Sequence, residues 1–241
     1  MIEIRRVSKS YNRGEVKAVD DLELTVPAGA IFGFLGPNGA GKTTTIKMIV
    51  GLLRPDSGSI VINGLDNSRQ ALQCKAMTTY VPDAPDVYER LTGKEYLNFI
   101  GDVYGVSGAD RRDRIDEWLD IFELRDAVHD PIQSYSHGMK QKIMLIAALL
   151  PKPKIFILDE PLVGLDPRSA HHLKEAMRRH CTQGGTLFFS THIMEVAEKL
   201  CDRIGIISHG RLVACGDLDE LRAQSRNQES LENIFLELTD K

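Results

Sequence analysis

The motif GPNGAGKT, at residues 36–43, matches the phosphate-binding pattern GxxxxGK followed by Ser or Thr, and it is the strongest indication of the fold. An apolar segment of strand length, IFGFL, precedes it at residues 31–35. The segment that follows, TTTIKMIVGLL at residues 43–53, carries apolar residues on one helical face. We therefore expect a strand, a glycine-rich loop and a helix in that order, which is the context that the pattern requires.

Such a loop binds the phosphates of a nucleotide through its backbone and a lysine, and the accompanying Mg²⁺ through a hydroxyl. Glycines let successive N–H groups point at phosphate oxygens, and the N-terminus of the helix adds positive partial charge. Lys42 is expected to meet the β and γ phosphates of a nucleotide, and the Thr43 hydroxyl is expected to ligate Mg²⁺. The predicted nucleotide-binding residues of this region are Asn38, Gly39, Ala40, Gly41, Lys42, Thr43 and Thr44. A chance glycine-rich turn is the competing interpretation.

Outward from the loop, apolar segments predict the remaining architecture. The alternating segments IEIRRV (2–7) and LELTV (22–26) indicate an N-terminal antiparallel sheet. Residues 91–150 have apolar side chains at three- and four-residue spacing, which indicates a helical insertion. After it, apolar strands alternate with helices, which is the rhythm of a parallel sheet. These strands lie in KIFILDEP (154–161), TLFFSTH (186–192) and RIGIISHG (203–210).

Composition and charge exclude several classes of protein. With 42% hydrophobic and 27% charged residues over 241 positions, the chain is typical of a soluble globular protein. Its net charge of −4 offers no global positive field for nucleic acid or an anionic membrane. No apolar run reaches the roughly 18 residues of a membrane span, so we expect the chain neither to enter nor to cross a membrane by itself. The four cysteines have neither disulfide nor zinc spacing, which favours reduced thiols in a cytosol.

A second motif, IFILDE at residues 155–160, helps to distinguish between the kinases, GTPases and ATPases that have a phosphate-binding loop. An apolar strand that ends in Asp159 can place this carboxylate beside the Mg²⁺ of a nucleotide. Glu160 is then placed to polarise the attacking water. The alternative is a surface acidic pair at a strand end, which explains the apolar residues before it less well.

The order of these motifs resembles the ATP-binding cassette (ABC) family, the nucleotide-binding subunits of ABC transporters, over nearly the whole chain. SHGMKQ, residues 136–141, stands where that family has its LSGGQ signature at the start of a helix. Ser136 and Gly138 match the signature, and the resemblance implies that they contact the γ-phosphate of ATP bound to the opposite subunit. The departures from the signature are Tyr135, His137 and Met139. The alternative is a plain capped helix.

Three further elements take roles through the same resemblance. GLDP, residues 164–167, looks like the D-loop, which lies across the dimer interface in this family. His192 looks like the switch histidine that contacts the γ-phosphate, because it follows an apolar strand 32 residues beyond Glu160. Tyr11 is similar to the A-loop aromatic that stacks on adenine.

The chain departs from the family after the strand TTYVP, residues 78–82, where the family usually has a Gln that meets Mg²⁺ and the attacking water. Asp83 stands there instead. A carboxylate can ligate Mg²⁺ but cannot donate an amide hydrogen bond, and it adds negative charge beside Asp159 and Glu160. We hypothesise that Asp83 keeps a metal-proximal role and alters the coupling to the membrane subunit. The alternative is that it only caps the loop before Pro85.

Residues and resemblance together predict an α/β fold: a P-loop NTPase core with a mainly parallel sheet, an N-terminal antiparallel β subdomain and a helical lobe that carries the signature. The expected organisation is a single ABC ATPase domain over residues 1–241. Its parts are a nucleotide-binding core at 1–90 and 151–216, the helical lobe at 91–150 and a C-terminal tail at 217–241, which is polar with a helical segment near its end.

The resemblance implies hydrolysis of ATP with Mg²⁺, in which Glu160 is the general base and Lys42 and His192 act on the γ-phosphate. The implied partners are a transmembrane permease subunit and a second cassette, identical or different, that closes with this one on ATP. The chain would then be cytoplasmic and peripheral on the inner face of the cell membrane. In the family a coupling helix of the permease enters the groove beside the helical lobe, which makes Tyr88, Tyr96 and Tyr104 candidates for docking.

The tail resembles that of ABC-2-type exporter cassettes, which favours export. Two other functions stay open. One is a soluble cassette ATPase that acts on DNA or the ribosome, against which the net charge of −4 weighs. The other is a switch that closes on ATP without hydrolysing it, against which Glu160 and His192 weigh.

Overall fold

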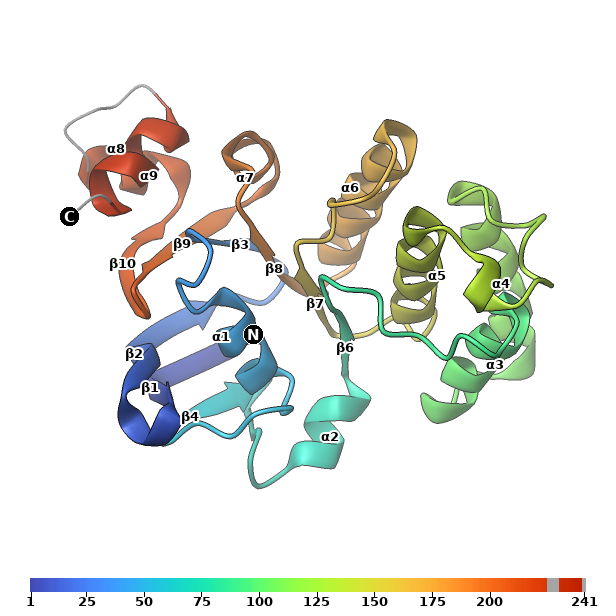
Figure 1. Cartoon of the computed structure of the whole chain (residues 1–241), viewed down its shortest axis with the longest axis horizontal. Helices are drawn as coiled ribbons and strands as arrows, with labels where there is room; N and C mark the ends of the chain where they lie inside the picture. The colour runs from blue at the N-terminus through green and yellow to red at the C-terminus, as the bar shows by residue number, and fades with distance from the viewer. Residues whose placement is uncertain (225–229, 240–241) are drawn as a thin grey trace.

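The computed structural model describes residues 1–224 and 230–239, apart from the side chain of Arg13, and its centre is a six-stranded sheet (Figure 1). The strand order is β10-β9-β3-β8-β7-β6, with all neighbours parallel except β9 and β10. The strands are β3 Ile31–Leu35, β6 Thr78–Val81, β7 Ile155–Asp159, β8 Thr186–Thr191, β9 Arg203–Ser208 and β10 Arg211–Gly216. Every residue of β3, β7 and β8 is buried, as expected for mainly apolar strands in a parallel sheet that is covered on both faces. The predicted parallel sheet is confirmed.

A second sheet, antiparallel and four-stranded, carries the N-terminus in the order β2-β1-β4-β5. Its strands are β1 Ile2–Tyr11, β2 Val16–Val26, β4 Ser57–Ile62 and β5 Leu65–Asp66. Ile2 and Ile4 point into the core by simple alternation, and Val7 is also buried because the register of β1 shifts between Ile4 and Val7. Arg6, at a φ of 51°, lies in this irregular stretch. The predicted N-terminal antiparallel sheet is confirmed.

Helix α1 (Lys42–Ile49) begins directly after the glycine-rich loop and lies between the two sheets (Figure 1). Its side chains Ile46, Met48 and Ile49 are buried in one cluster with residues of both sheets. The predicted order of strand, loop and helix is confirmed, and α1 joins the two sheets into one core.

Three helices extend the molecule beyond β6 and β7: α3 (Gly93–Val103), α4 (Gly108–Ile121) and α5 (His137–Leu149) (Figure 1). Each has a hydroxyl side chain at its N-cap that accepts a backbone N–H of the first turn. These caps are Thr92, Ser107 and Ser136. Leu97 and Trp118 belong to the same buried cluster as Leu158 of β7, so the helices share a core with the sheet.

The remaining helices are α2 (Ala71–Ala76), α6 (Pro167–Thr182), α7 (Met194–Leu200), α8 (Leu218–Gln224) and α9 (Leu231–Thr239). The tail from residue 217 contains α8 and, near its end, the predicted helical segment, which is α9. Leu221, Leu231 and Ile234 are fully buried, in a cluster with residues of α7, β9 and β10. Residues 225–229 and 240–241 of the expected tail lie outside the described residues.

The helices and the cysteines bear on two of the predictions made from composition. Within residues 1–224 and 230–239, no helix has the length and apolar character that a membrane span requires. All four cysteines are free thiols, as their spacing predicts.

Candidate active site

The loop between β3 and α1 packs closely against the rest of the chain because glycine stands where no side chain fits. A Cβ on Gly41 would lie 2.3 Å from the carbonyl oxygen of Ala18, and the φ of Gly41 is +108°. A Cβ on Gly36 would lie 2.5 Å from the carbonyl oxygen of Ile207. Both distances are too short for real atoms, so these two positions require glycine. The loop therefore lies against the backbone of β2 and β9, and α1 begins directly after it.

Lys42 holds a nearly buried positive charge inside this loop. Its side chain is 8% exposed, and its Nζ lies 3.8 Å from Oε1 of Glu160. Nζ donates hydrogen bonds to the carbonyl oxygens of Gly36 at 2.6 Å and Pro37 at 3.3 Å. An ammonium held this way, with few contacts to water, attracts an anion more strongly than a solvated lysine does.

The loop and the acidic strand end enclose one cavity of about 210 Å³. Its lining brings together most of the residues predicted to bind the nucleotide or the metal. These residues are Asn38, Gly39, Gly41, Lys42, Thr43, Thr44, Asp83, Asp159 and Glu160. Ala40 is 3% exposed and does not line the cavity, and its carbonyl oxygen accepts the Gly210 N–H instead.

The oxygen atoms of Thr43 and Asp159 meet at this cavity. Thr43 Oγ1 donates to Asp159 Oδ2 at 2.8 Å, and Asp159 is 1% exposed. Hydroxyl and carboxylate oxygens are ligands that Mg²⁺ prefers, and in nucleotide sites one or two carboxylates with phosphate oxygens and waters suffice. The donor set present here fits Mg²⁺. The described residues contain no cluster of three or more His, Cys, Asp or Glu side chains able to hold a metal ion.

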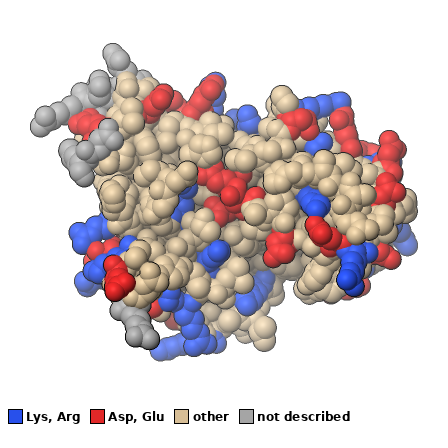
Figure 2. Space-filling model, viewed as in Figure 1, with Lys and Arg blue, Asp and Glu red and all other residues tan. Residues whose placement is uncertain are grey.

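Asp83 lies near the same pair of residues. Besides lining the cavity, it acts on the phenol of Tyr80, whose pKa is raised above its ordinary value by burial and then by the charges of Asp159 and Asp83. The sequence places Asp83 two residues after β6, which pairs with β7 along its length. The carboxylates of Asp83, Asp159 and Glu160 therefore face one space. Figure 2 shows acidic side chains gathered near the middle of this face, where β7 and β8 lie in Figure 1.

Glu160 and His192 form a contact at the carboxyl ends of two neighbouring strands. Glu160 directly follows β7 and His192 directly follows β8, and His192 Nδ1 lies 3.0 Å from Glu160 Oε2. Glu160 has a φ of 48°, a left-handed conformation that costs a non-glycine residue about 1 to 2 kcal/mol. Its carboxylate is 12% exposed, whereas the imidazole is 56% exposed and open to a ligand. A carboxylate base and an imidazole thus stand together beside the loop.

Tyr11, Ser136 and Gly138 do not line the cavity. Tyr11 ends β1 and is 40% exposed, so its ring is free to stack on a ligand. Ser136 caps α5, and a Cβ on Gly138 would lie 3.0 Å from the carbonyl oxygen of Gly164. Within one chain the signature therefore packs against the predicted D-loop rather than against the phosphate loop.

An ion pair that the sequence did not indicate ties these two segments together. Asp166 caps α6 and accepts from the Ser169 N–H at 2.9 Å, and Lys142 Nζ of α5 lies 2.9 Å from its other oxygen. The Ser169 N–H and hydroxyl, followed by Lys142, hold the pKa of Asp166 far below its usual range. Asp166 stays ionised, so the link between the signature helix and the D-loop persists at ordinary pH.

Sequence reasoning also missed Ser190. Its buried hydroxyl donates to Asp159 Oδ1 at 2.5 Å and accepts the Glu160 N–H at 3.0 Å. The available signal was a serine among apolar residues near the end of TLFFSTH, two positions before His192. A serine there is unusual for a buried strand, but only the pairing of β7 with β8 shows which residues it meets.

Fold and site together define a P-loop nucleotide-binding protein, in which the loop, Lys42 and an acidic strand end form one cavity. Residues 19–163 match the family described as ABC transporter. The chain is 38% identical to the linearmycin resistance ATP-binding protein LnrL of Bacillus subtilis, over 92% of this chain and 70% of that protein. It is 35% identical to the ABC-type transporter ATP-binding protein EcsA of Bacillus subtilis, over 99% of this chain and 96% of that protein. The chain belongs to the ABC transporter family, as its motifs predicted.

Solved structures agree with this family. The structure of an ATP-binding subunit of an ABC transporter superposes with a TM-score of 0.94 at 36% identity, over 99% of each chain. A dimeric ATP-binding cassette in a post-hydrolysis state, bound to ADP and Pi, has a TM-score of 0.82 at 23% identity, over 90% of this chain and 98% of that one. The predicted fold class is confirmed as the ABC cassette fold.

Proposed function

We propose that the chain hydrolyses ATP and powers export through a separate transmembrane permease. The observation that carries the proposal is the meeting of Lys42, Thr43, Asp159 and Glu160 in one cavity, with His192 in contact with Glu160. The names of its relatives support export. They include the daunorubicin/doxorubicin resistance ATP-binding protein DrrA of Streptomyces peucetius, at 39% identity, and a Nod factor export ATP-binding protein of Paraburkholderia xenovorans, at 39% identity.

The side chains of the site have distinct roles in this proposal. Lys42 and the loop N–H groups would hold the phosphates, and Thr43 and Asp159 would hold Mg²⁺. Bound Mg²⁺ would neutralise charge on the phosphate oxygens. Glu160 accepts the proton of the attacking water, and His192 donates a hydrogen bond toward the γ-phosphate position. Because most of the barrier to phosphoryl transfer is met by positioning and charge, these few groups suffice.

Two cassettes are needed to complete the proposed site. Ser136 and Gly138 lie at the N-terminus of α5, outside the cavity of their own chain. A helix N-terminus with a hydroxyl suits a phosphate, so we propose that it meets the phosphates bound to a second cassette, identical or different. Tyr11 then stacks on the adenine. This arrangement supports ATP-driven closure of the dimer as the mechanical step.

The test is steady-state hydrolysis of Mg-ATP against protein concentration. A rate that rises faster than linearly with concentration, and that disappears in Glu160→Gln, is expected if composite sites in a dimer are active. A linear rate would contradict the composite site. Tight ATP binding without hydrolysis, alone or with the permease, would favour the switch instead.

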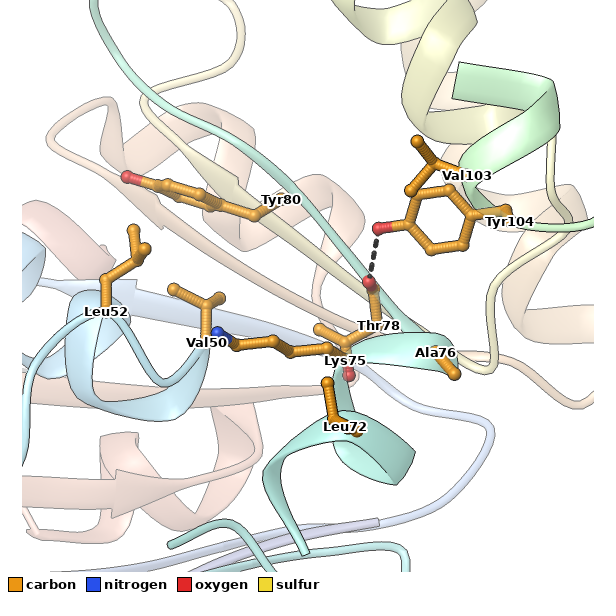
Figure 3. Close-up of a pocket in the computed structure, with 9 residues that line it drawn as sticks. All are labelled: Val50, Leu52, Leu72, Lys75, Ala76, Thr78, Tyr80, Val103 and Tyr104. Carbon is orange, nitrogen blue, oxygen red and sulfur yellow. Dashed lines mark hydrogen bonds between the residues drawn. The ribbon is translucent and has the colours of Figure 1, made fainter. Parts of the chain in front are cut away.

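An apolar groove beside α3 gives the proposed permease a place to dock. It has a volume of about 560 Å³ and lies between α2, β6 and the end of α3 (Figure 3). Its apolar lining residues are Val50, Leu52, Leu72, Ala76 and Val103. Leu52, Leu72 and Val103 are 61%, 85% and 62% exposed, which is costly in water and typical of a surface that a partner covers. We propose that an amphipathic segment of the permease occupies this groove, holding the chain at the inner face of the membrane.

The three tyrosines that were candidates for docking differ in position. Tyr104 lines it, and its hydroxyl donates to the Thr78 carbonyl oxygen at 3.0 Å (Figure 3). Tyr96 is 8% exposed and belongs to the core, whereas Tyr88 is 60% exposed and packs edge-on against Phe99. Of the three candidates, Tyr104 therefore lines the groove, whereas Tyr88 is exposed but is not among the lining residues.

Changing Leu72 to Glu is expected to reduce association with the permease about 10-fold or more, because it places a charge in an apolar interface. Leu72 is 85% exposed, so folding and basal hydrolysis of the isolated chain should be unchanged. The measurement is recovery of the chain with its co-expressed permease from detergent extracts. Leu236→Glu, at a residue 47% exposed on α9, is the matched control. Equal recovery of both variants would exclude docking in this groove.

Changing Asp83 to Gln tests the metal-proximal role of Asp83. The change removes one of three carboxylates around the cavity, so the Mg²⁺ concentration for half-maximal hydrolysis should rise about 3- to 10-fold. Permease-stimulated turnover should change as well, because an amide can donate a hydrogen bond that a carboxylate cannot. Asp86→Asn, in the same loop but outside the cavity lining, is the control. If basal and stimulated turnover both matched the unmodified chain, Asp83 would only cap its loop.

A further inference from the structure

Ser190 lies in β8, between the strand that follows the signature helix and the strand that precedes the phosphate loop. It is fully buried, and it stands directly opposite Asp159 in the pairing of β7 with β8. Its Oγ is 2.5 Å from Asp159 Oδ1 and 3.0 Å from the backbone nitrogen of Glu160. One hydroxyl therefore contacts the side chain of Asp159, at the end of β7, and the backbone of Glu160, which follows it.

The directions of these two hydrogen bonds follow from the chemistry of the groups. An ionised carboxylate only accepts and a backbone N–H only donates, so the hydroxyl gives its proton to Asp159 and accepts from Glu160. Asp159 Oδ2 accepts from Thr43 Oγ1 at 2.8 Å. Each oxygen of this carboxylate is thus held by a hydroxyl, one from the phosphate-loop helix and one from β8.

The contact with Glu160 acts on the backbone. At a φ of 48°, Glu160 has left the extended conformation of β7, and its N–H bonds the Ser190 side chain. This turn directs the carboxylate toward Lys42 Nζ at 3.8 Å and His192 Nδ1 at 3.0 Å. A left-handed non-glycine residue persists only when its surroundings fix it, and the Ser190 hydroxyl is one such restraint.

We propose that Ser190 is a positioning residue that sets the Asp159 carboxylate for the metal and the Glu160 carboxylate for the attacking water. The expected effect of Ser190 on the rate rests on the proposed ATPase function. Its expected effect on metal binding does not. Ser190 is fully buried and does not line the cavity. It acts through Asp159 and Glu160, which it holds at a fixed separation.

The test compares Ser190→Ala with Ser190→Thr, which keeps the hydroxyl, and Ser190→Cys, which keeps the size but is a weak donor. Ser190→Ala should lower kcat about 10- to 100-fold, because it leaves the Glu160 N–H and one Asp159 oxygen unpaired, while KM for ATP changes less. Thr should restore most of the rate, and Cys should give an intermediate value. Thr186→Val, which removes another buried hydroxyl at the opposite end of β8, should retain the rate.

A second readout does not depend on hydrolysis. The affinity for a fluorescent ATP analogue is measured once in EDTA and once in Mn²⁺, with every variant made in the Glu160→Gln background. Ser190→Ala should reduce the gain in affinity that Mn²⁺ provides by about 10-fold and leave the affinity in EDTA unchanged. Thermal unfolding establishes that each variant is folded.

The outcomes separate the two proposals. Wild-type kcat together with a wild-type gain from Mn²⁺ in Ser190→Ala would overturn the positioning role. A lower unfolding temperature with an unchanged gain from Mn²⁺ would assign Ser190 to packing alone and would overturn it as well. If the unmodified chain hydrolysed no ATP under any condition, the proposed function would fail, and the Mn²⁺ titration would still decide the role of Ser190.

Discussion

Changing Glu160 to Gln is expected to lower the rate of ATP turnover about 10²- to 10⁴-fold while ATP still binds. Gln has nearly the same shape as Glu, but its amide cannot accept the proton of the attacking water. The carboxylate lies 3.0 Å from His192 Nδ1 and 3.8 Å from Lys42 Nζ, so it already stands beside the predicted phosphate position. Removing its negative charge also removes repulsion with the phosphates, which favours retention of ATP.

The measurement pairs steady-state phosphate release with equilibrium binding of ATP to the same preparation. Glu175→Gln removes a carboxylate from the exposed surface of α6, where it lies near His171 and His172, and serves as the control. Dimers that accumulate on ATP in Glu160→Gln but not in the unmodified chain would support closure before hydrolysis. Turnover of Glu160→Gln within a few-fold of the unmodified chain would remove Glu160 from the role of general base.

Changing Lys42 to Met is expected to weaken ATP binding about 10²-fold and to abolish measurable hydrolysis at ordinary ATP concentrations. Met keeps the length of the side chain but loses the charge. Lys42 is 8% exposed, and the loop carbonyl oxygens of Gly36 and Pro37 hold its ammonium in place. A charge that is already ordered and partly removed from water contributes more to phosphate binding than a flexible surface lysine does.

Lys47→Met is the matched control, because Lys47 lies on the exposed side of the same helix, outside the cavity lining. Calorimetric titration with ATP in Mg²⁺ measures the affinity of each variant. Thermal unfolding in the absence of nucleotide should show similar stability for Lys42→Met and the unmodified chain. Undiminished affinity in Lys42→Met would exclude the loop as the phosphate site.

Much of the architecture could be predicted because local patterns are strong here. The mainly apolar segments that form β3, β7 and β8 are buried at every residue, and the glycine-rich loop lies between a strand and a helix as its pattern requires. Predictions were weaker for the end of the chain. The polar composition after residue 217 gives no indication that Leu221, Leu231 and Ile234 are buried. They are buried because α7, β9 and β10 provide an apolar surface for them.

Local patterns predict the elements, the phosphate-binding loop and the residue types of the site, since spacing along a helix or strand and glycine in a tight loop are local properties. The way in which the strand ends meet depends instead on the pairing of distant segments. Asp159 and Ser190 lie 31 positions apart in sequence, yet they are paired because β7 and β8 are parallel neighbours. The left-handed turn at Glu160 and its contact with His192 likewise depend on this pairing, because contacts between distant segments are set by packing and not by local pattern.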